Sequence, residues 1–244
     1  MSLIEEHTDE FIRLVKKRDE QKCIEYINKY DDFYNAKYLE GTYPLNMLQL
    51  ACTKRLDQVA IALIDKKCDL TYHNNSGYTA LIYAYVYELE NVTAHIIDNI
   101  ADITTRKITC NLSEMMYICD KKNINNVIKM IDRGYDIYCK SIMNMSLFTI
   151  AVHQQIEEIV KKLIDMDTDF VSQFNIQYIE LVDKQHKFYN DIMKYCVDKR
   201  NTIKDTIIAT MNDATSTNAL YKSFHKTYAV VLVDVICDFI LLKL

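Results

Sequence analysis

The segment Leu63-Ile64-Asp65-Lys66-Lys67-Cys68-Asp69 decides the fold of this 244-residue chain. Shortened copies of it recur as Ile96-Ile97-Asp98…Asp102, Met130-Ile131-Asp132…Asp136 and Leu163-Ile164-Asp165…Asp169. The first and the second Asp both advance by 33, 34 and 33 residues from copy to copy. Such a period is typical of a repeat protein. Each copy has the pattern of a helix end: two aliphatic residues pack inward, the first Asp faces water, and the second Asp caps the outgoing loop.

Residues able to cap a helix open the repeats at the same period. They are Asn46, Thr79, Ser113 and Ser146, again 33, 34 and 33 residues apart. Their side chains can accept a backbone N–H that is otherwise unpaired at a helix start. A short apolar helix follows each cap, and a polar turn then leads to a second helix. One such pair cannot bury its own apolar face, so the sequence predicts an all-α solenoid of stacked helix-turn-helix repeats.

The N-terminal part has the pattern of a diverged copy. Two apolar stripes over residues 8–30 predict a pair of helices, with Thr8 as the expected cap of the first. Asp32 precedes Asp69 by 37 residues, which indicates about four inserted residues around 38–44. We assign residues 1–39 to an N-terminal capping helical pair and residues 40–172 to four repeats.

The repeat weakens beyond residue 172. Cys196-Val197-Asp198 follows Leu163-Ile164-Asp165 by 33 residues, so residues 173–202 are interpreted as an eroded fifth repeat. Residues 203–244 have no counterpart upstream and are expected to form a C-terminal helical cap or extension. Within it the sequence predicts a helix over 203–211, a polar loop over 212–218 and a long helix from Ala219 to the end.

The last helix is apolar nearly all round between Val230 and Leu242, with Asp234 and Asp238 on one polar stripe. This run is shorter than the roughly 20 apolar residues that a membrane span needs. A helix of this kind must be covered on several sides. It therefore either packs as the end cap of the stack or forms a contact with another chain, for example a homodimer through residues 228–244.

Composition and charge exclude several classes of protein. The chain holds three Gly, one Pro and no Trp, which argues against an all-β fold with its many special turns. Its 29 basic and 34 acidic residues give a net charge of -5, so nucleic acid is not an expected partner. The mildly basic stretches 16–18 and 184–204 are flanked or interrupted by acidic residues and are interpreted as solvated faces.

Eight cysteines show neither a C-x-x-C pair nor a Cys/His spacing suited to zinc. Cys52, Cys119, Cys196 and Cys237 lie in apolar helical patterns, where a free thiol behaves as a small hydrophobic group. The N-terminus has no apolar stretch of signal-peptide length. We therefore expect free thiols in a reducing compartment, the cytoplasm, and no transmembrane segment.

The sequence offers no motif for catalysis. Glycine occurs only at positions 41, 77 and 134, so there is no phosphate-binding glycine loop, and neither G-x-S-x-G nor H-E-x-x-H is present. The six histidines are scattered singly. Carboxylates at equivalent positions of stacked repeats would lie about 10 Å apart, too far to share a metal ion. We predict no catalytic, metal or cofactor-binding residues, and hence no enzyme.

The run Gly77-Tyr78-Thr79-Ala80-Leu81-Ile82-Tyr83-Ala84, followed by Ile96-Ile97 and Ala101-Asp102, resembles the ankyrin repeat. That family has the pattern G-x-T-P-L-H-x-A and a distal L-L-x-x-G-A-D. The copies here are degenerate: Asn111 and Asn144 occupy positions where the family prefers Gly, and Gln49, Ile82, Met116 and Thr149 replace its His. The AT-rich composition and the degeneracy are similar to those of ankyrin proteins from large DNA viruses or intracellular parasites.

The resemblance implies a concave face, formed by inter-repeat fingers and first helices, that recognises another protein. Carried over by position, the protein-binding residues are Tyr43, Thr53, Lys54, His73, Asn75, Ser76, Tyr78, Tyr87, Arg106, Asp120, Lys121, Met143, Met145 and His153. Exposed Tyr, Met and Arg are typical of interface cores. The alternative is that Tyr78 and Tyr87 only shield a loosely built stack.

Three functions remain open at this point. The first is a non-enzymatic module that binds another protein; if the source is viral, the expected partner is a host protein in the host cytoplasm. The second is a structural or assembly subunit that self-associates through the apolar C-terminal helix. The third is an adaptor that recruits a ubiquitin-ligase core, which ranks last because residues 203–244 contain no Leu-Pro-centred F-box-like motif.

Overall fold

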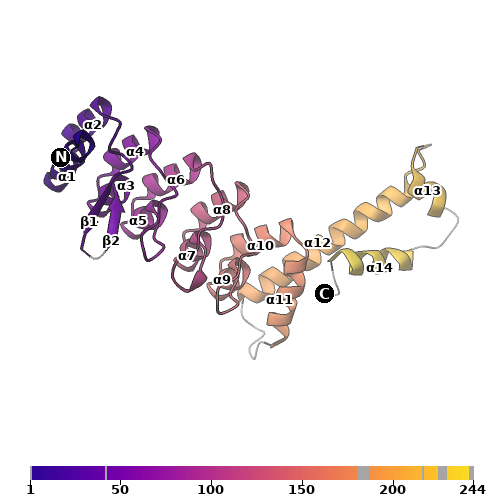
Figure 1. The fold of residues 1–244 in the computed structure, drawn as a ribbon. Helices are drawn as coiled ribbons and strands as arrows, with labels where there is room; N and C mark the ends of the chain where they lie inside the picture. Colours follow the sequence, from indigo (N-terminus) through magenta and orange to yellow (C-terminus); the bar gives the residue numbers. More distant parts are fainter. Residues whose placement is uncertain (1, 42, 181–186, 216, 225–229, 242–244) are drawn as a thin grey trace. The chain divides into compact units, whose positions relative to one another are not determined.

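The computed structural model describes residues 2–41, 43–180, 187–215, 217–224 and 230–241 (Figure 1). Helices dominate the described chain, which confirms the all-α prediction at the level of fold class. The chain divides into two compact units, Met1–Ile150 and Ala151–Leu244. The division falls inside helix α9 (Leu147–His153) and so within the fourth predicted repeat.

The first unit is built from consecutive helix pairs. They are α1 (Leu3–Lys17) with α2 (Glu20–Lys29), α3 (Met47–Thr53) with α4 (Asp57–Asp65), α5 (Ala80–Val86) with α6 (Glu90–Asn99), and α7 (Glu114–Asp120) with α8 (Ile124–Asp132). Each first helix packs on the next first helix, α1 on α3, α3 on α5 and α5 on α7. The second helices do the same, α2 on α4, α4 on α6 and α6 on α8. Two layers of helices result, with the apolar core between them (Figure 1).

The predicted helix caps are confirmed at all four positions. Asn46 Oδ1 accepts the backbone N–H of Gln49 at 2.8 Å, and the Thr79 hydroxyl caps α5 in the same way. Ser113 Oγ accepts from Met116 at 3.1 Å and Ser146 Oγ from Thr149 at 3.2 Å. All four capping residues are buried. A cap of this type stabilises a helix by about 1 kcal/mol.

The cap predicted at Thr8 is wrong. Helix α1 begins at Leu3, five residues earlier, and Ser2 is its N-cap in a capping box with Glu5. The Thr8 hydroxyl instead donates to the carbonyl of Ile4 at 2.7 Å inside the helix. The capping box offered by Ser2 and Glu5 satisfies two unpaired backbone N–H groups at once, so it starts the helix upstream.

Left-handed residues separate the two helices of each pair. Arg55, Glu88, Lys122 and Gln155 have φ values of 57°, 60°, 62° and 57°, and they advance by 33, 34 and 33 residues. In the pair α7/α8 the N–H of Lys122 donates to Cys119 O at 2.8 Å and that of Asn123 donates to Ile118 O at 3.3 Å. This is the Schellman arrangement, in which glycine is the usual left-handed residue.

Hairpin-shaped loops, called fingers below, join successive pairs. Finger 1 is the hairpin of β1 (Lys37–Glu40) and β2 (Tyr43–Asn46), which pairs Lys37 with Asn46. It occupies the site of the predicted insertion, which was not expected to form strands. Fingers 2, 3 and 4 cover residues 73–79, 107–113 and 140–146, and each is closed by one isolated β-bridge. The short 3-10 helix η1 (Thr109–Asn111) lies in finger 3.

The second Asp of each repeated segment caps its loop, as predicted, in the first three copies. Asp69, Asp102 and Asp136 accept the backbone N–H two residues ahead, at 2.8, 2.9 and 2.9 Å. In the fourth copy the prediction is wrong for Asp169. That residue begins α11 and donates its own N–H to the carboxylate of Asp167.

The first Asp of the segment faces water but is not isolated. In the first unit, Asp65 lies 2.8 Å from His95 Nε2 and Asp98 lies 2.6 Å from Lys129 Nζ. Each contact joins one second helix to the next. Partly exposed pairs of this kind contribute less than about 1 kcal/mol each.

The second unit contains α10 (Glu157–Met166), α11 (Asp169–Glu180), α12 (Lys187–Asn212), α13 (Ala219–Phe224) and α14 (Val230–Leu241). Helix α12 packs on α10, and both α13 and α14 contact α12. It runs without a break through residue 203, so the helix predicted over 203–211 is its continuation. Residues 213–218 separate α12 from α13, close to the predicted loop.

The long helix predicted from Ala219 is described as α13 and α14; residues 225–229 between them lie outside the described residues, as do residues 242–244. Helix α14 buries Val233 and Cys237, and Asp234 accepts from Lys204 on α12 at 2.6 Å. The four cysteines predicted in apolar helical faces, Cys52, Cys119, Cys196 and Cys237, are all buried. Burial raises the pKa of the Cys119 thiol to about 12 and that of Cys196 to about 11, so both are protonated at neutral pH.

Candidate functional site

A groove lined by tyrosines lies between finger 2 and helix α5. Its volume is about 230 Å³, and its lining residues are Tyr43, Asn74, Ser76, Tyr78, Ile82, Tyr83, Val86 and Tyr87. We call it the tyrosine groove. None of these side chains is charged at neutral pH, so the groove favours an uncharged group.

Helical spacing explains how α5 contributes its rings. Tyr83 and Tyr87 are four residues apart and therefore lie on one helix face. Their rings are stacked at 6.4 Å between centroids with planes 10° apart. Tyr78 from finger 2 meets Tyr83 edge-on at 6.1 Å. The three rings hold one another in place, since aromatic pairs in these geometries are favourable by about 0.5–1.5 kcal/mol each.

Asn74 fixes both walls of the groove. Its Oδ1 accepts the backbone N–H groups of Ser76 at 2.9 Å and Tyr78 at 3.0 Å, which closes the tip of finger 2. Its Nδ2 donates to the hydroxyl of Tyr83 at 2.9 Å. The relative exposure of Asn74 is only 2%. Finger 2 and α5 are thus joined through a single buried amide.

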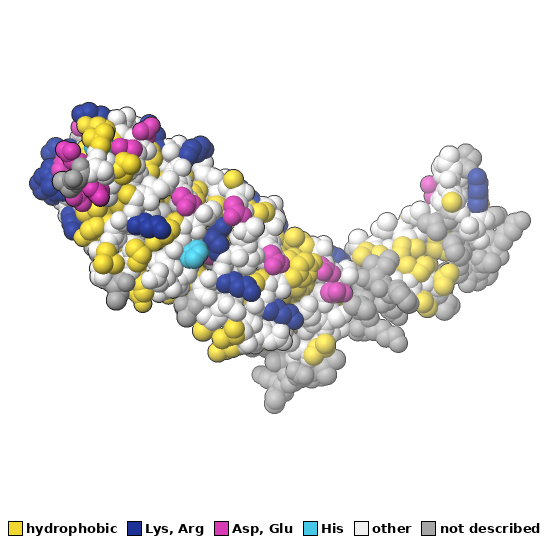
Figure 2. All heavy atoms as spheres, viewed as in Figure 1, with side chains coloured by type: hydrophobic (Ala, Val, Ile, Leu, Met, Phe, Trp, Pro, Cys, Tyr) yellow, Lys and Arg dark blue, Asp and Glu magenta, His cyan; other side chains and the backbone are white. Residues whose placement is uncertain are grey.

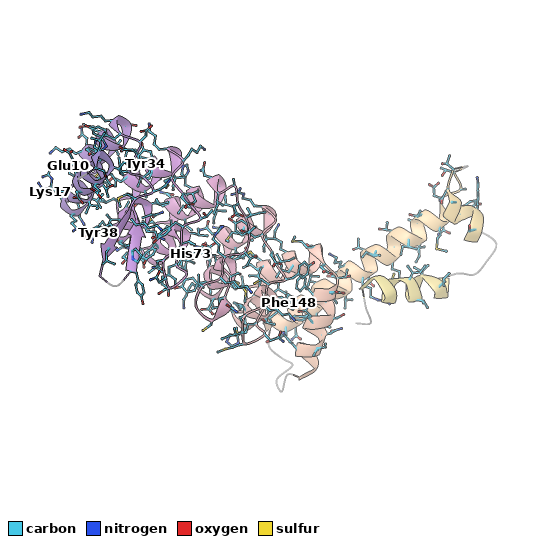
Figure 3. All side chains as sticks on the ribbon, in the orientation of Figure 1. Glu10, Lys17, Tyr34, Tyr38, His73 and Phe148 are labelled. Carbon is cyan, nitrogen blue, oxygen red and sulfur yellow. The ribbon has the colours of Figure 1, made fainter. Side chains whose placement is uncertain are left out.

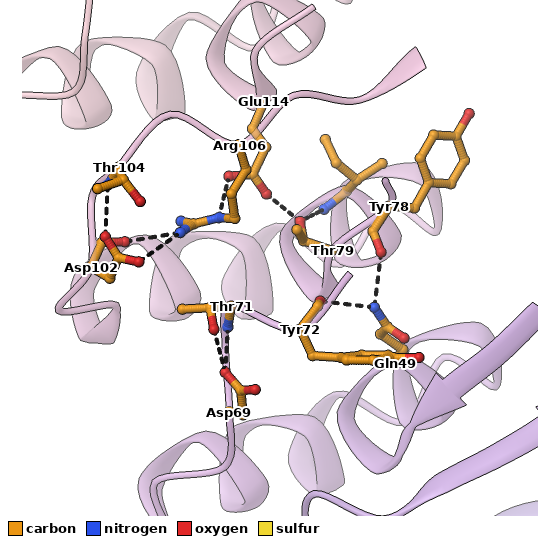
Figure 4. Close-up of polar contacts among 11 residues, drawn as sticks. Gln49, Asp69, Thr71, Tyr72, Tyr78, Thr79, Asp102, Thr104, Arg106 and Glu114 are labelled. Atoms are coloured by element: carbon orange, nitrogen blue, oxygen red, sulfur yellow. Dashed lines mark hydrogen bonds and ion pairs between the residues drawn. The ribbon is translucent and has the colours of Figure 1, made fainter. Parts of the chain in front are cut away.

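Gln49 supports the base of the same finger from helix α3. Its Nε2 donates to the carbonyls of Tyr72 at 3.3 Å and Tyr78 at 3.0 Å (Figure 4). Gln49 is fully buried, so these two bonds satisfy a side chain that water cannot reach. This residue stands where the ankyrin pattern has His.

Gly77 allows finger 2 to lie against finger 3. It has φ of +77°, and a Cβ at this position would meet the carbonyl oxygen of Lys107 at 2.9 Å. Only glycine combines this backbone angle with so close an approach. On the other side of the contact, His73, Asn75 and Lys107 line an open hollow.

A buried ion pair lies behind the fingers. Arg106 Nε donates to Glu114 at 3.1 Å, and the Thr79 hydroxyl donates to the other oxygen of the same carboxylate (Figure 4). Glu114 is 3% exposed. Burial raises the pKa of Glu114, while Arg106 and Thr79 oppose that rise. The pair links the residue that precedes finger 3, the start of α7 and the cap of α5.

The structure brings four of the predicted binding residues together in the tyrosine groove: Tyr43, Ser76, Tyr78 and Tyr87. His73 and Asn75 lie on the other side of finger 2, where Figure 3 labels His73. Seven predicted residues in the first unit lie outside both hollows: Thr53, Lys54, Arg106, Asp120, Lys121, Met143 and Met145. Met143 is 71% exposed at the tip of finger 4. His153 belongs to the second unit and is exposed.

The sequence predicts that Arg106 is exposed, whereas the structure buries most of its side chain. Its side chain is only 10% exposed because Glu114 and the carbonyl of Asp102 both draw the guanidinium inward. Asn74 and Tyr83 also belong to the site, although neither was predicted from the sequence. The four-residue spacing of Tyr83 and Tyr87 indicates that Tyr83 shares a helix face with Tyr87. For Asn74 the signal is an Asn that lies two residues before a turn residue.

On the face shown in Figure 2, hydrophobic side chains form small groups between basic and acidic ones. Among the described residues, no group of three or more His, Cys, Asp or Glu could hold a metal ion. None of the described helices is both long enough and apolar enough to cross a membrane. No protein-family model and no curated protein sequence matches this chain.

Proposed function

We propose that this chain is an ankyrin-type repeat stack that binds another protein through the tyrosine groove and the fingers beside it. The constant 33- and 34-residue steps of the caps, left-handed residues and fingers support the repeat assignment. The buried free thiols agree with a reducing compartment, and a host protein would then be a reachable partner.

The observation that carries the binding proposal is the groove itself. Tyr43 and Val86 remain 42% and 49% exposed at its edge, although large apolar side chains on a stack of this kind would gain by burial. Tyrosine and aliphatic side chains around a shallow pocket are typical of interface anchor points. At about 230 Å³ the groove holds one or two side chains, while a stable complex needs about 800 Å² from each partner. The neighbouring fingers supply the remaining surface.

The experiment is capture of proteins from a host lysate by the full chain and by Val86→Glu. A carboxylate in the uncharged groove is expected to abolish capture of the specific partner, because it would be buried without a counter-charge. Asn125→Glu on α8 is the matched control, since Asn125 is exposed on a second helix away from the groove. Equal capture by both variants would contradict the proposal.

One observation favours a second candidate, self-association through α14. This helix packs mainly on α12, and Leu232 and Val235 remain 42% and 50% exposed. If these residues form a dimer contact, Val235→Glu converts a dimer into a monomer by light scattering of the full chain. A wild-type chain that is monomeric at all concentrations removes this candidate.

A further inference from the structure

Three buried side-chain donors in the first unit reach no acceptor among the described residues: Arg106 Nη2, Arg133 Nη1 and the Tyr135 hydroxyl. Arg106 and Tyr135 are the two that line a common cavity. The Arg106 side chain is 10% exposed and Tyr135 is 6% exposed. Leaving a buried donor unpaired is unfavourable, and most native structures avoid it.

The surrounding bonds explain why Arg106 keeps one free donor. Its Nε is bound to Glu114, and its Nη1 donates to the carbonyl of Asp102 at 3.1 Å. The second oxygen of Glu114 accepts from the Thr79 hydroxyl. Arg106 Nη2 reaches neither oxygen of Glu114, so the two-pronged contact between guanidinium and carboxylate is not formed.

The position of Tyr135 is fixed just as firmly. Gly134, in the left-handed conformation, ends α8, and the N–H of Tyr135 donates back to Met130 O at 3.2 Å. This turn places the ring inside the protein. Burial raises the pKa of the Tyr135 hydroxyl, and the negative charge of Glu114 adds to that rise.

Arg106 and Tyr135 both line the same small cavity. Its volume is about 10 Å³, and it is lined by Thr105, Arg106, Ser113, Glu114, Met115, Tyr135 and Asp136. A single water molecule needs roughly 10–15 Å³ of such space and two to four polar partners. The cavity is too small for any larger ligand, and Arg106 is already neutralised by Glu114.

We propose that this cavity is a binding site for one internal water molecule. The water accepts from Arg106 Nη2 and from the Tyr135 hydroxyl, and it donates to the carboxylate of Glu114. It thereby joins the residue that precedes finger 3, the start of α7 and the end of α8, and completes the hydrogen bonding of the buried ion pair.

The test combines a high-resolution crystal structure with oxygen-17 magnetic relaxation dispersion, which counts long-lived internal waters in solution. We expect a density peak within hydrogen-bond distance of both atoms in the wild-type chain. In Tyr135→Phe one long-lived water is lost. Tyr34→Phe is the matched control, because the Tyr34 hydroxyl is buried but donates directly to Ile27 O at 2.6 Å. Its count of long-lived waters should not change.

Two results would overturn the proposal. One is a wild-type crystal structure with no peak between Arg106 and Tyr135, with Nη2 bound instead to a protein oxygen. The other is an equal number of long-lived waters in the wild-type chain and Tyr135→Phe.

Discussion

At the scale of single residues, the scarcity of glycine means that residues with side chains occupy strained, left-handed backbone positions. Arg55, Glu88, Lys122 and Gln155 all adopt the left-handed conformation between paired helices. A residue with a side chain is disfavoured there by about 1–2 kcal/mol relative to its right-handed form. The Schellman hydrogen bonds at these turns offset this backbone strain, because they satisfy the last carbonyls of each first helix.

Replacing one of these residues by glycine should stabilise the protein. Lys122→Gly is expected to raise the free energy of unfolding by about 0.5–1 kcal/mol, because glycine adopts φ of 62° without steric cost. Lys121→Gly is the control: that residue has φ of -91°, so glycine there relieves no backbone strain and should not stabilise the protein. Urea denaturation measures both. A destabilised Lys122→Gly variant would refute the strain argument.

Glycine substitutions separate backbone angle from close packing. Gly41, Gly77 and Gly134 all have positive φ, but only Gly77 would place a Cβ against backbone atoms. We expect Gly41→Ala and Gly134→Ala to cost about 1 kcal/mol each from the backbone angle. Gly77→Ala should cost at least about 1 kcal/mol more, because finger 3 must move away. Thermal unfolding of the three variants tests this order, and equal losses would show that the two fingers do not pack as described.

At the scale of helices, contacts from one second helix to the next recur through the Asp of the repeated segment. In the second unit, Asp165 on α10 accepts from Lys199 Nζ at 2.5 Å and from the Tyr195 hydroxyl at 2.6 Å, both on α12. Burial by itself would raise the pKa of Asp165, but these two hydrogen bonds and the charge of Lys199 outweigh it and lower the pKa.

This lowered pKa predicts a pH-dependent stabilisation of the α10–α12 contact. The ionised carboxylate is favoured in the folded state, so the stabilisation is present above the unfolded pKa of about 3.8 and is lost as the pH falls through the lower folded value. Asp165→Asn should therefore lose less than about 1 kcal/mol at pH 7, since the pair is half exposed, and the difference from wild type should vanish in acid. Denaturation at pH 7 and pH 3 measures it, with the exposed Asp205→Asn as control. A larger difference in unfolding free energy between Asp165→Asn and the wild-type chain in acid than at pH 7 would contradict the prediction.

At the scale of the whole molecule, the sequence predicted what the repeat period controls. Caps such as Asn46 and Ser113 and loop residues such as Asp69 follow from hydrogen bonds between residues close in sequence, and a constant step makes their positions equivalent. Contacts between repeats were not predictable in the same way. Arg106 turns inward because Glu114 comes from the next helix, which a linear pattern does not reveal.

The repeat period also predicted no structure for the segments in which the repeat is interrupted. Finger 1 became a β-hairpin because its inserted residues let β1 and β2 pair fully. Helix α12 continued past residue 203, since no cap or glycine occurs there to end it. The tyrosine groove was predicted only in part for a related reason: Tyr83 and Asn74 are defined by packing between finger 2 and α5, not by the repeat.

The central claim, that the tyrosine groove binds a protein, is tested most directly by titration calorimetry with the protein that the wild-type chain captures. We predict that Val86→Glu raises the Kd at least about tenfold, which corresponds to about 1.4 kcal/mol, and that Asn125→Glu leaves it unchanged. Equal Kd values for the wild-type chain and Val86→Glu would contradict the claim.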